Sequence, residues 1–368
     1  MKLTVTTNWA EDFLDKVSQF NEVEWIRGRL FKDEVGGQML LNNFVKHPSR
    51  KTLEKTVKKV HAMRKKFSYA LNGHCLDNKE YSFEGQTRIS QFISWIQDSG
   101  VDAVTVVIPH LAEMIKGQFP DLQVELGGAM KLGEMIRLKY FAGLGADMIV
   151  LRADWNRHFS LLKECKKNLS CKLKLIVNSL CMFFCNFSYD HENLLSHTSH
   201  AGTKIPYCRY YNYLCNQERL KNPAEIIQAG FIRPEDIAVY EAMGYEDFVI
   251  MSNSPDTQEL IKIVSFYTSR RFDGNLLEIM SLLGEKPFQT RQGKIDKRAP
   301  GIDNRQLDGF LSFFQKGRNC HYNVCQTECG YCNMKINTAL IQTPHESKAA
   351  LKKFYEKQSN KIEEGVFA

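Results

Sequence analysis

The feature that most constrains this chain is a regular alternation of short apolar, β-branched runs with amphipathic stretches. Eight runs are expected to form strands, at residues 3–6, 23–28, 67–71, 103–108, 122–126, 147–152, 173–178 and 247–251. Because parallel strands need a crossover between them, eight strand–helix alternations predict a closed (β/α)8 barrel, an α/β fold of the TIM type. An open doubly wound sheet is the alternative. No G-x-G-x-x-G follows the first strand, so a dinucleotide-binding crevice is not supported.

The alternation is interrupted once and stops before the chain does. Residues 179–246 separate the seventh and eighth predicted strands, and a loop of that length is uncommon unless it is functional. We therefore expect a barrel over residues 1–268 that carries this insertion, followed by a C-terminal extension, 269–368. Within the extension, the polar and charged residues 291–304 predict a linker or exposed loop, and residues 347–360 predict a terminal helix.

Composition and charge limit the class of protein. Hydrophobic residues make up 43% of the chain, but no apolar run reaches the roughly 18 residues of a membrane span, and no signal peptide is recognisable. We expect a cytoplasmic protein with no membrane span. Eleven cysteines are then better explained by metal binding than by disulfides. The net charge of +7 permits an RNA partner without arguing for one.

A first group of cysteines lies in the insertion and consists of Cys181, Cys185, Cys208 and Cys215. Cys181 follows a predicted strand directly, at the end of the barrel where active sites are built. If the chain turns helical there, the four-residue spacing places the Cys181 and Cys185 sulfurs on one face. Four thiolates suit a [4Fe–4S] cluster, a [2Fe–2S] cluster or tetrahedral zinc. The alternative is that some of these residues are ordinary buried cysteines.

A second group lies in the extension: Cys320, Cys325, Cys329 and Cys332. Four cysteines within 13 residues indicate a compact metal site. The last three have the C-x3-C-x2-C spacing of radical S-adenosylmethionine enzymes, but they lie beyond the last strand rather than after the first. Cys320 offers a fourth ligand, so we favour a closed structural or electron-transfer cluster, with zinc as the alternative.

Three further residues are candidates for catalysis or substrate binding: His191, Arg209 and Arg157. His191 and Arg209 lie in the insertion beside the cysteines, and a guanidinium can bind a carboxylate with two hydrogen bonds. His191-Glu192 with His197 is not the zinc-protease motif H-E-x-x-H, because histidines six residues apart lie on nearly opposite sides of a helix. Cys75 follows the third predicted strand, and either a ligand role or a bland loop position is open.

The run from residue 147 to 251 resembles peptidase family U32. The most distinctive matching segments are Asn178-x-x-Cys181 at a strand end and Arg233-Pro234-Glu235-Asp236. The resemblance implies a barrel, and it implies that Cys181, Cys185, Cys208 and Cys215 hold an iron–sulfur cluster. Relatives include proteins of oxygen-independent hydroxylation, which act on ubiquinone precursors or on RNA bases, and others described as collagenases or peptidases.

This chain departs from the family pattern in two places. The family often has arginine and histidine after the second cysteine, whereas here residues 186–191 lack the arginine. The group from Cys320 to Cys332 has no counterpart in the pattern, which suggests a subfamily with two clusters. For the whole chain we expect one or two [4Fe–4S] clusters, with zinc as the alternative.

These patterns leave four hypotheses, in order of preference. The first is an iron–sulfur enzyme that carries out oxygen-independent hydroxylation or a related redox modification of a small aromatic, RNA or peptide substrate. The second is a zinc peptidase or other hydrolase. The third is a non-catalytic partner subunit of a modification complex, and the fourth is radical S-adenosylmethionine chemistry at Cys325, Cys329 and Cys332.

Overall fold

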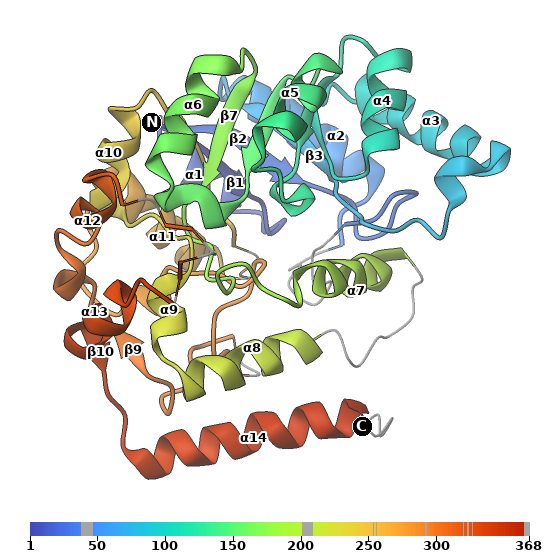
Figure 1. Cartoon of the computed structure of the whole chain (residues 1–368). Helices are drawn as coiled ribbons and strands as arrows, with labels where there is room; N and C mark the ends of the chain where they lie inside the picture. The colour runs from blue at the N-terminus through green and yellow to red at the C-terminus, as the bar shows by residue number, and fades with distance from the viewer. Residues whose placement is uncertain are drawn as a thin grey trace.

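Eight parallel strands form a closed barrel in the order of the sequence, β1 to β8, with β8 pairing back to β1. A computed structural model describes residues 1–37, 47–200, 209–252, 254, 256–290, 293–318, 320–321, 324–325 and 327–363, and the side chains of 198–200 are not described. The barrel strands are β1 Lys2–Thr6, β2 Val23–Gly28, β3 Lys66–Leu71, β4 Ala103–Val106, β5 Gln123–Leu126, β6 Met148–Leu151, β7 Lys172–Ile176 and β8 Asp247–Val249. The predicted (β/α)8 barrel and its eight strands are confirmed (Figure 1).

Helices surround the barrel and build the two added parts. Around the barrel they are α1 Phe13–Val17, α2 Arg50–Ala62, α3 Phe83–Asp98, α4 Pro109–Gln118, α5 Met135–Gly143, α6 Phe159–Asn168, α10 Ile237–Glu241 and α11 Thr257–Ser269. The insertion adds α7 Ser188–His200, α8 Tyr210–Lys221 and α9 Ala224–Gln228. The extension adds α12 Ser312–Gln315, α13 Tyr331–Ala339, α14 His345–Glu363 and the short strands β9 Gly301–Ile302 and β10 Leu340–Ile341. No helix of the described residues is long and apolar enough to span a membrane.

The helix α2 illustrates how local sequence signals set these elements. Ser49 caps its N-terminus by accepting a hydrogen bond from the backbone N–H of Thr52, which satisfies one of the free donors of the first turn. Leu53, Val57 and Val60 are buried at helical spacing, so one face of the helix packs on the barrel while the lysines face solvent.

The interior of the barrel contains a buried ionic group rather than apolar side chains alone. The Glu125 carboxylate on β5 is fully buried and pairs with Arg27 of β2 and with Lys174 of β7, whose Nζ lies 2.7 Å from Oε2. Thr105 of β4 donates to Oε1 at 3.0 Å. Burial alone would raise the pKa of Glu125, but the two cations outweigh it and lower the pKa to about 2. Four strands are thereby joined through one carboxylate.

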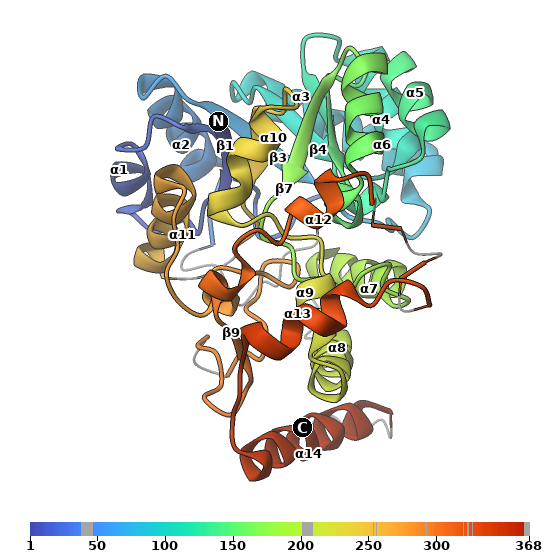
Figure 2. The ribbon, with the colours of Figure 1, turned by 60° about the vertical axis from the view of Figure 1, so that its left-hand side comes forward.

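The insertion and the extension lie together on one side of the barrel. In Figure 1, α7, α8 and α14 follow one another in layers away from the strands, and α14 packs on α8. Figure 2 shows α13 beside α9, so the extension covers the insertion along a second side as well.

The predicted linker at residues 291–304 is wrong in its second half. Residues 299–302 are buried, and β9 pairs with β10 in an antiparallel ribbon. The side-chain amide of the buried Asn304 donates to the Phe272 carbonyl at 2.6 Å. The backbone carbonyl of Asn304 accepts a hydrogen bond from the Arg233 guanidinium at 2.9 Å. Tertiary hydrogen bonds therefore order a segment whose composition is typical of an exposed loop. The terminal helix predicted at 347–360 is present as α14.

The Glu125 group yields a stability prediction. Glu125→Gln leaves the buried Lys174 and Arg27 without a counter-charge, so we expect the free energy of unfolding to fall by about 3–5 kcal/mol in urea titrations followed by circular dichroism. Because the folded pKa is lowered, the ionic contribution is complete above the unfolded pKa of about 4.3 and is lost as the pH falls toward 2. The control is Glu84→Gln, because Glu84 forms an exposed pair with Arg88, and this variant should unfold at the same urea concentration as the wild type. If Glu125→Gln and Glu84→Gln unfold at the same urea concentration, the buried carboxylate does not stabilise the barrel.

Candidate metal centre and cavity

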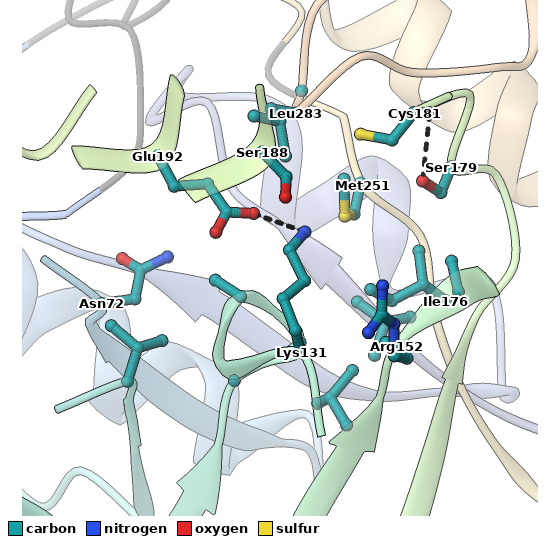
Figure 3. A pocket seen from close by; sticks show the side chains of 18 of the residues that line it. Asn72, Lys131, Arg152, Ile176, Ser179, Cys181, Ser188, Glu192, Met251 and Leu283 are labelled. Carbon is teal, nitrogen blue, oxygen red and sulfur yellow. Dashed lines mark hydrogen bonds and ion pairs between the residues drawn. The ribbon is translucent and has the colours of Figure 1, made fainter. Parts of the chain in front are cut away.

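A cavity of about 130 Å³ opens at the carboxyl ends of the barrel strands. Residues at the ends of all eight strands line it, from Thr6, the last residue of β1, to Met251, two residues after β8. The insertion contributes Cys181, Cys185, Ser188 and Glu192, and the extension contributes Leu283 and Gly284. Figure 3 shows side chains from these parts converging on one space. The cavity therefore has the position of a barrel active site and is built jointly by barrel, insertion and extension.

Asn178 fixes the chain immediately before the first cysteine. Its buried side-chain amide donates to the carbonyls of Met251 at 2.7 Å and Ile279 at 3.1 Å, and its Oδ1 accepts from the Met251 N–H at 2.8 Å. The extension also pairs with this segment through its backbone, since Leu180 N–H donates to the Ser281 carbonyl at 2.8 Å. The Asn178-x-x-Cys181 segment thus ties β7, β8 and the extension together at the point where Cys181 begins the site.

Three cysteines of the first predicted group, Cys181, Cys185 and Cys215, come together beside the cavity. Cys181 and Cys185 are joined by a turn with Phe184 at φ 49°, not by the helix that the sequence suggested, and Cys185 N–H donates to the Met182 carbonyl at 3.1 Å. Cys215 reaches them from α8. The Cys185 thiol donates to the Cys215 sulfur, which raises the pKa of Cys185 and lowers that of Cys215. Burial raises the pKa of Cys181. Cys208 lies outside the described residues.

A buried arginine accompanies this cysteine group. Arg219 of α8 has no exposed side-chain surface, and its guanidinium donates to the Leu180 carbonyl and helps to lower the pKa of Cys215. Within the described part of the chain, its Nε and Nη1 have no oxygen or nitrogen acceptor. The sequence analysis did not identify Arg219, although its position four residues after Cys215 on a helix was a usable signal.

Ion pairs line the rest of the cavity. Lys131 has a left-handed backbone (φ 52°), which is uncommon for a side chain of this size, and extends toward Glu192 of α7, with Nζ 2.7 Å from Oε1 (Figure 3). Burial alone would lower the pKa of Lys131, but Glu192 and Cys181 outweigh it and raise the pKa. Arg152 pairs with Asp154 at 2.7 Å. No sequence spacing links Lys131 to Glu192, so only the fold reveals this pair.

The three residues predicted for catalysis do not line the cavity. His191 is buried on α7 next to Glu192, and burial lowers its pKa to about 4, so it is neutral at pH 7. Arg209 pairs with Glu285 of the extension at 2.9 Å. Arg157 is buried and donates to the Ile227 carbonyl at 2.7 Å. Their catalytic role stays a prediction, and their positions give it no direct contact with the cavity.

The second cysteine group also comes together in space, around Arg157. Burial raises the pKa of Cys320 to about 12 and that of Cys332 to about 11. The nearby Arg157 guanidinium lowers both pKa values but is outweighed by burial, and Cys325 and Cys329 raise both further. Cys320 N–H donates to the Arg157 carbonyl at 3.3 Å. Among the described residues, Nε and Nη2 of Arg157 lack a hydrogen-bond acceptor. Each cysteine group is therefore accompanied by one buried guanidinium, and in each guanidinium two of the nitrogens have no oxygen or nitrogen acceptor within the described part of the chain.

The two cysteine groups offer the ligand type that two kinds of metal site take. Four thiolates suit an iron–sulfur cluster, and they also suit tetrahedral zinc. Among the described residues, no three of these thiols all lie within 4.8 Å of one another. By ligand type, the cysteines of each group fit an iron–sulfur cluster.

An aromatic contact connects the two groups. The Trp155 ring packs against Phe184, which precedes Cys185, with centroids 5.5 Å apart, and against His321, which follows Cys320, at 5.9 Å. One indole ring thus bridges the surroundings of the two cysteine groups.

Comparisons with known proteins agree with this architecture. Residues 41–262, more than half of the chain, match the model of peptidase family U32. A protein of Methanocaldococcus jannaschii named "Uncharacterized protease MJ1657" is 26% identical over 332 residues, which cover 88% of this chain and 94% of that protein. The structure of the U32 peptidase Mk0906 superposes with a TM-score of 0.52 at 18% identity, over 68% of this chain and 91% of that one. The structural likeness is evidence for a shared fold.

The Asn178 junction yields a second prediction. Asn178→Leu removes the partner of three backbone groups, so we expect the free energy of unfolding to fall by about 2–4 kcal/mol in denaturant titrations. The control is Asn168→Leu, because Asn168 donates only to the exposed Glu164 carbonyl of its own helix. If the Asn178 variant unfolds at the same denaturant concentration as the control, Asn178 does not join these segments.

Proposed function

This chain belongs to peptidase family U32, and we propose that it is an iron–sulfur enzyme for oxygen-independent hydroxylation or a related redox modification. The family resemblance expected from the sequence is confirmed. The observation that carries the proposal is the convergence of Cys181, Cys185 and Cys215 with the buried Arg219 at the mouth of the barrel. When bound there, an iron–sulfur cluster supplies one-electron redox chemistry.

The buried arginines support cluster binding because a buried charge is costly without a counter-charge. Four large arginine side chains are almost fully buried. Arg29 pairs with Asp33 at 3.0 Å and Arg233 with Asp236 at 2.8 Å. For Arg157 and Arg219, the described residues provide carbonyls and thiols instead of a carboxylate. A thiolate-bound cluster would supply the missing negative charge in both places.

The cavity residues have roles of their own in this proposal. Lys131 and Arg152 present cations that attract an anionic or carbonyl-bearing group, and Glu192 and Asp154 hold them in place. The helix α7 contributes Ser188 and Glu192 to the wall of the cavity. A cavity of about 130 Å³ admits a small group, so an RNA or peptide substrate would insert one base or side chain, whereas a small aromatic acid would enter whole.

The second cysteine group would exchange electrons with the first. Trp155 lies between their neighbouring aromatic residues, and the extension that carries the second group also supplies the backbone pairing next to Cys181. The group therefore has two proposed tasks, to relay electrons and to stabilise the extension.

Peptide hydrolysis is the second candidate function, because the relative from M. jannaschii is named as a protease. Ser179 and Ser188 line the cavity and are the available hydroxyl groups of the insertion. We expect the anaerobically purified protein to leave gelatin and small peptides intact. Hydrolysis by a zinc-loaded, iron-free preparation would favour this alternative, and activity that requires a second protein would favour a role as partner subunit.

The two cysteine groups predict separable clusters. Cys181→Ala and Cys329→Ala should each remove about half of the iron and sulfide from anaerobically prepared protein, with different electron paramagnetic resonance signals lost. Cys171→Ser is the matched control, because Cys171 is half-buried ahead of β7 and away from both groups, and it should keep the full content. Loss of all iron in either variant, or of none in both, would contradict two independent clusters.

The arginines predict a redox signature. Removing a buried positive charge disfavours the more negative, reduced cluster, so Arg219→Leu should move the midpoint potential of the cavity cluster to more negative values. Arg219→Lys keeps the charge and should shift it less, and Arg157→Leu should shift only the second cluster. Redox titrations followed by electron paramagnetic resonance measure the midpoint potentials of both clusters. Unchanged potentials in the Leu variants would show that the guanidinium groups do not act on clusters.

A further inference from the structure

A third group of metal-binding side chains lies outside both cysteine groups. Cys75 and Asp77, in the loop after β3, meet His197 on α7, and one ligand atom from each lies within 4.8 Å of the other two. The His197 Nδ1 is 3.8 Å from the Asp77 Oδ1. His197 lies 120 positions after Asp77 in the sequence. None of the three residues lines the cavity, and the family match gives them no role.

The loop holds its two ligands in a defined turn. Asp77 and Asn78 both adopt left-handed backbone conformations, with φ of 54° and 60°, which are uncommon outside glycine. This turn brings the Asp77 N–H to the Cys75 sulfur at 3.4 Å, a contact that fixes the position of the sulfur within the loop. The Asp77 Oδ2 is 3.5 Å from the Lys79 amino group, which leaves Oδ1 facing the histidine.

Further contacts fix the loop to the helix. The backbone N–H of His74 donates to the Ser196 hydroxyl at 2.6 Å, and the His74 Nε2 lies 3.2 Å from the Glu192 carboxylate. The hydrogen bond between His74 and Ser196 lies one residue before Cys75 and one residue before His197, so the two sides of the site are held in register. The donors therefore form a built site between two elements rather than a chance meeting of surface chains.

We propose that Cys75, Asp77 and His197 bind one Zn²⁺ ion, with water as the fourth ligand. Thiolate, carboxylate and imidazole are the three ligand types that zinc takes in proteins, and three protein ligands leave one open position. The ion would fasten α7 to the barrel. Because α7 carries Ser188 and Glu192 into the cavity, zinc at this position stabilises the roof of the site. The inference does not depend on the iron–sulfur proposal.

The test uses the full chain, treated with a chelator and then titrated with zinc. Zinc is counted per chain, and the X-ray absorption fine structure of the bound zinc gives its ligands. We expect one zinc that the wild type binds and Cys75→Ser loses, with a first shell of one sulfur and the rest nitrogen or oxygen. Asp77→Asn and His197→Ala should weaken the affinity by at least about tenfold. Cys171→Ser and Asp190→Asn, an exposed acid on the same helix, should bind as the wild type.

Amide hydrogen exchange separates a folding defect from loss of the ion. Zinc should slow exchange in α7 of the wild type and not of Cys75→Ser, while both proteins exchange alike in chelator. An all-sulfur shell that is unchanged in Cys75→Ser would place the zinc at the other cysteines and overturn the proposal. Equal zinc affinity in the wild type and the three ligand variants would overturn it as well.

Discussion

Two buried guanidinium groups, those of Arg219 and Arg157, are the constraint on which the candidate site depends. Both are almost fully removed from water, and both keep N–H groups without an acceptor among the described residues. Elsewhere in the same molecule buried arginines have an aspartate partner. A charge placed in a low-dielectric interior needs an opposite charge nearby. The groups beside these two include thiols and backbone carbonyls, and Arg157 also lies over the rings of Phe231 and Phe310. The arrangement is consistent with two sites that carry negative charge when loaded with metal.

The barrel provides the rigid frame for the first of these sites. Glu125, Arg27 and Lys174 connect strands within the barrel, and Asn178 connects the ends of β7 and β8 with the extension. Cys181 follows only three residues after Asn178, so its position is set by buried hydrogen bonds rather than by a free loop. The insertion then returns through α8 to bring Cys215 and Arg219 to the same place.

The sequence predicted the barrel well because β-branched runs and helical periodicity are local signals, and all eight strands were found. The structure brings Cys181, Cys185 and Cys215 together, as their grouping in the sequence suggested, and a turn at Phe184 joins the first two. Their role as metal ligands stays a prediction, and Cys208 lies outside the described residues. It did not reveal Lys131 with Glu192, because their pairing depends on how α7 lies across the barrel. Arg157 was a candidate for substrate binding because a guanidinium can bind a carboxylate, yet it lies against the extension, whose packing has no local signal.

If both cysteine groups hold clusters, the protein contains iron and sulfide in equal amounts. Anaerobic purification of the full chain, with iron, acid-labile sulfide and zinc counted per chain and the visible spectrum recorded, measures this. We expect about eight irons and eight sulfides, as two [4Fe–4S] clusters require, with any zinc in addition to them. Zinc at the cysteine groups with no sulfide would exclude the clusters and would favour hydrolysis or a structural role over redox chemistry.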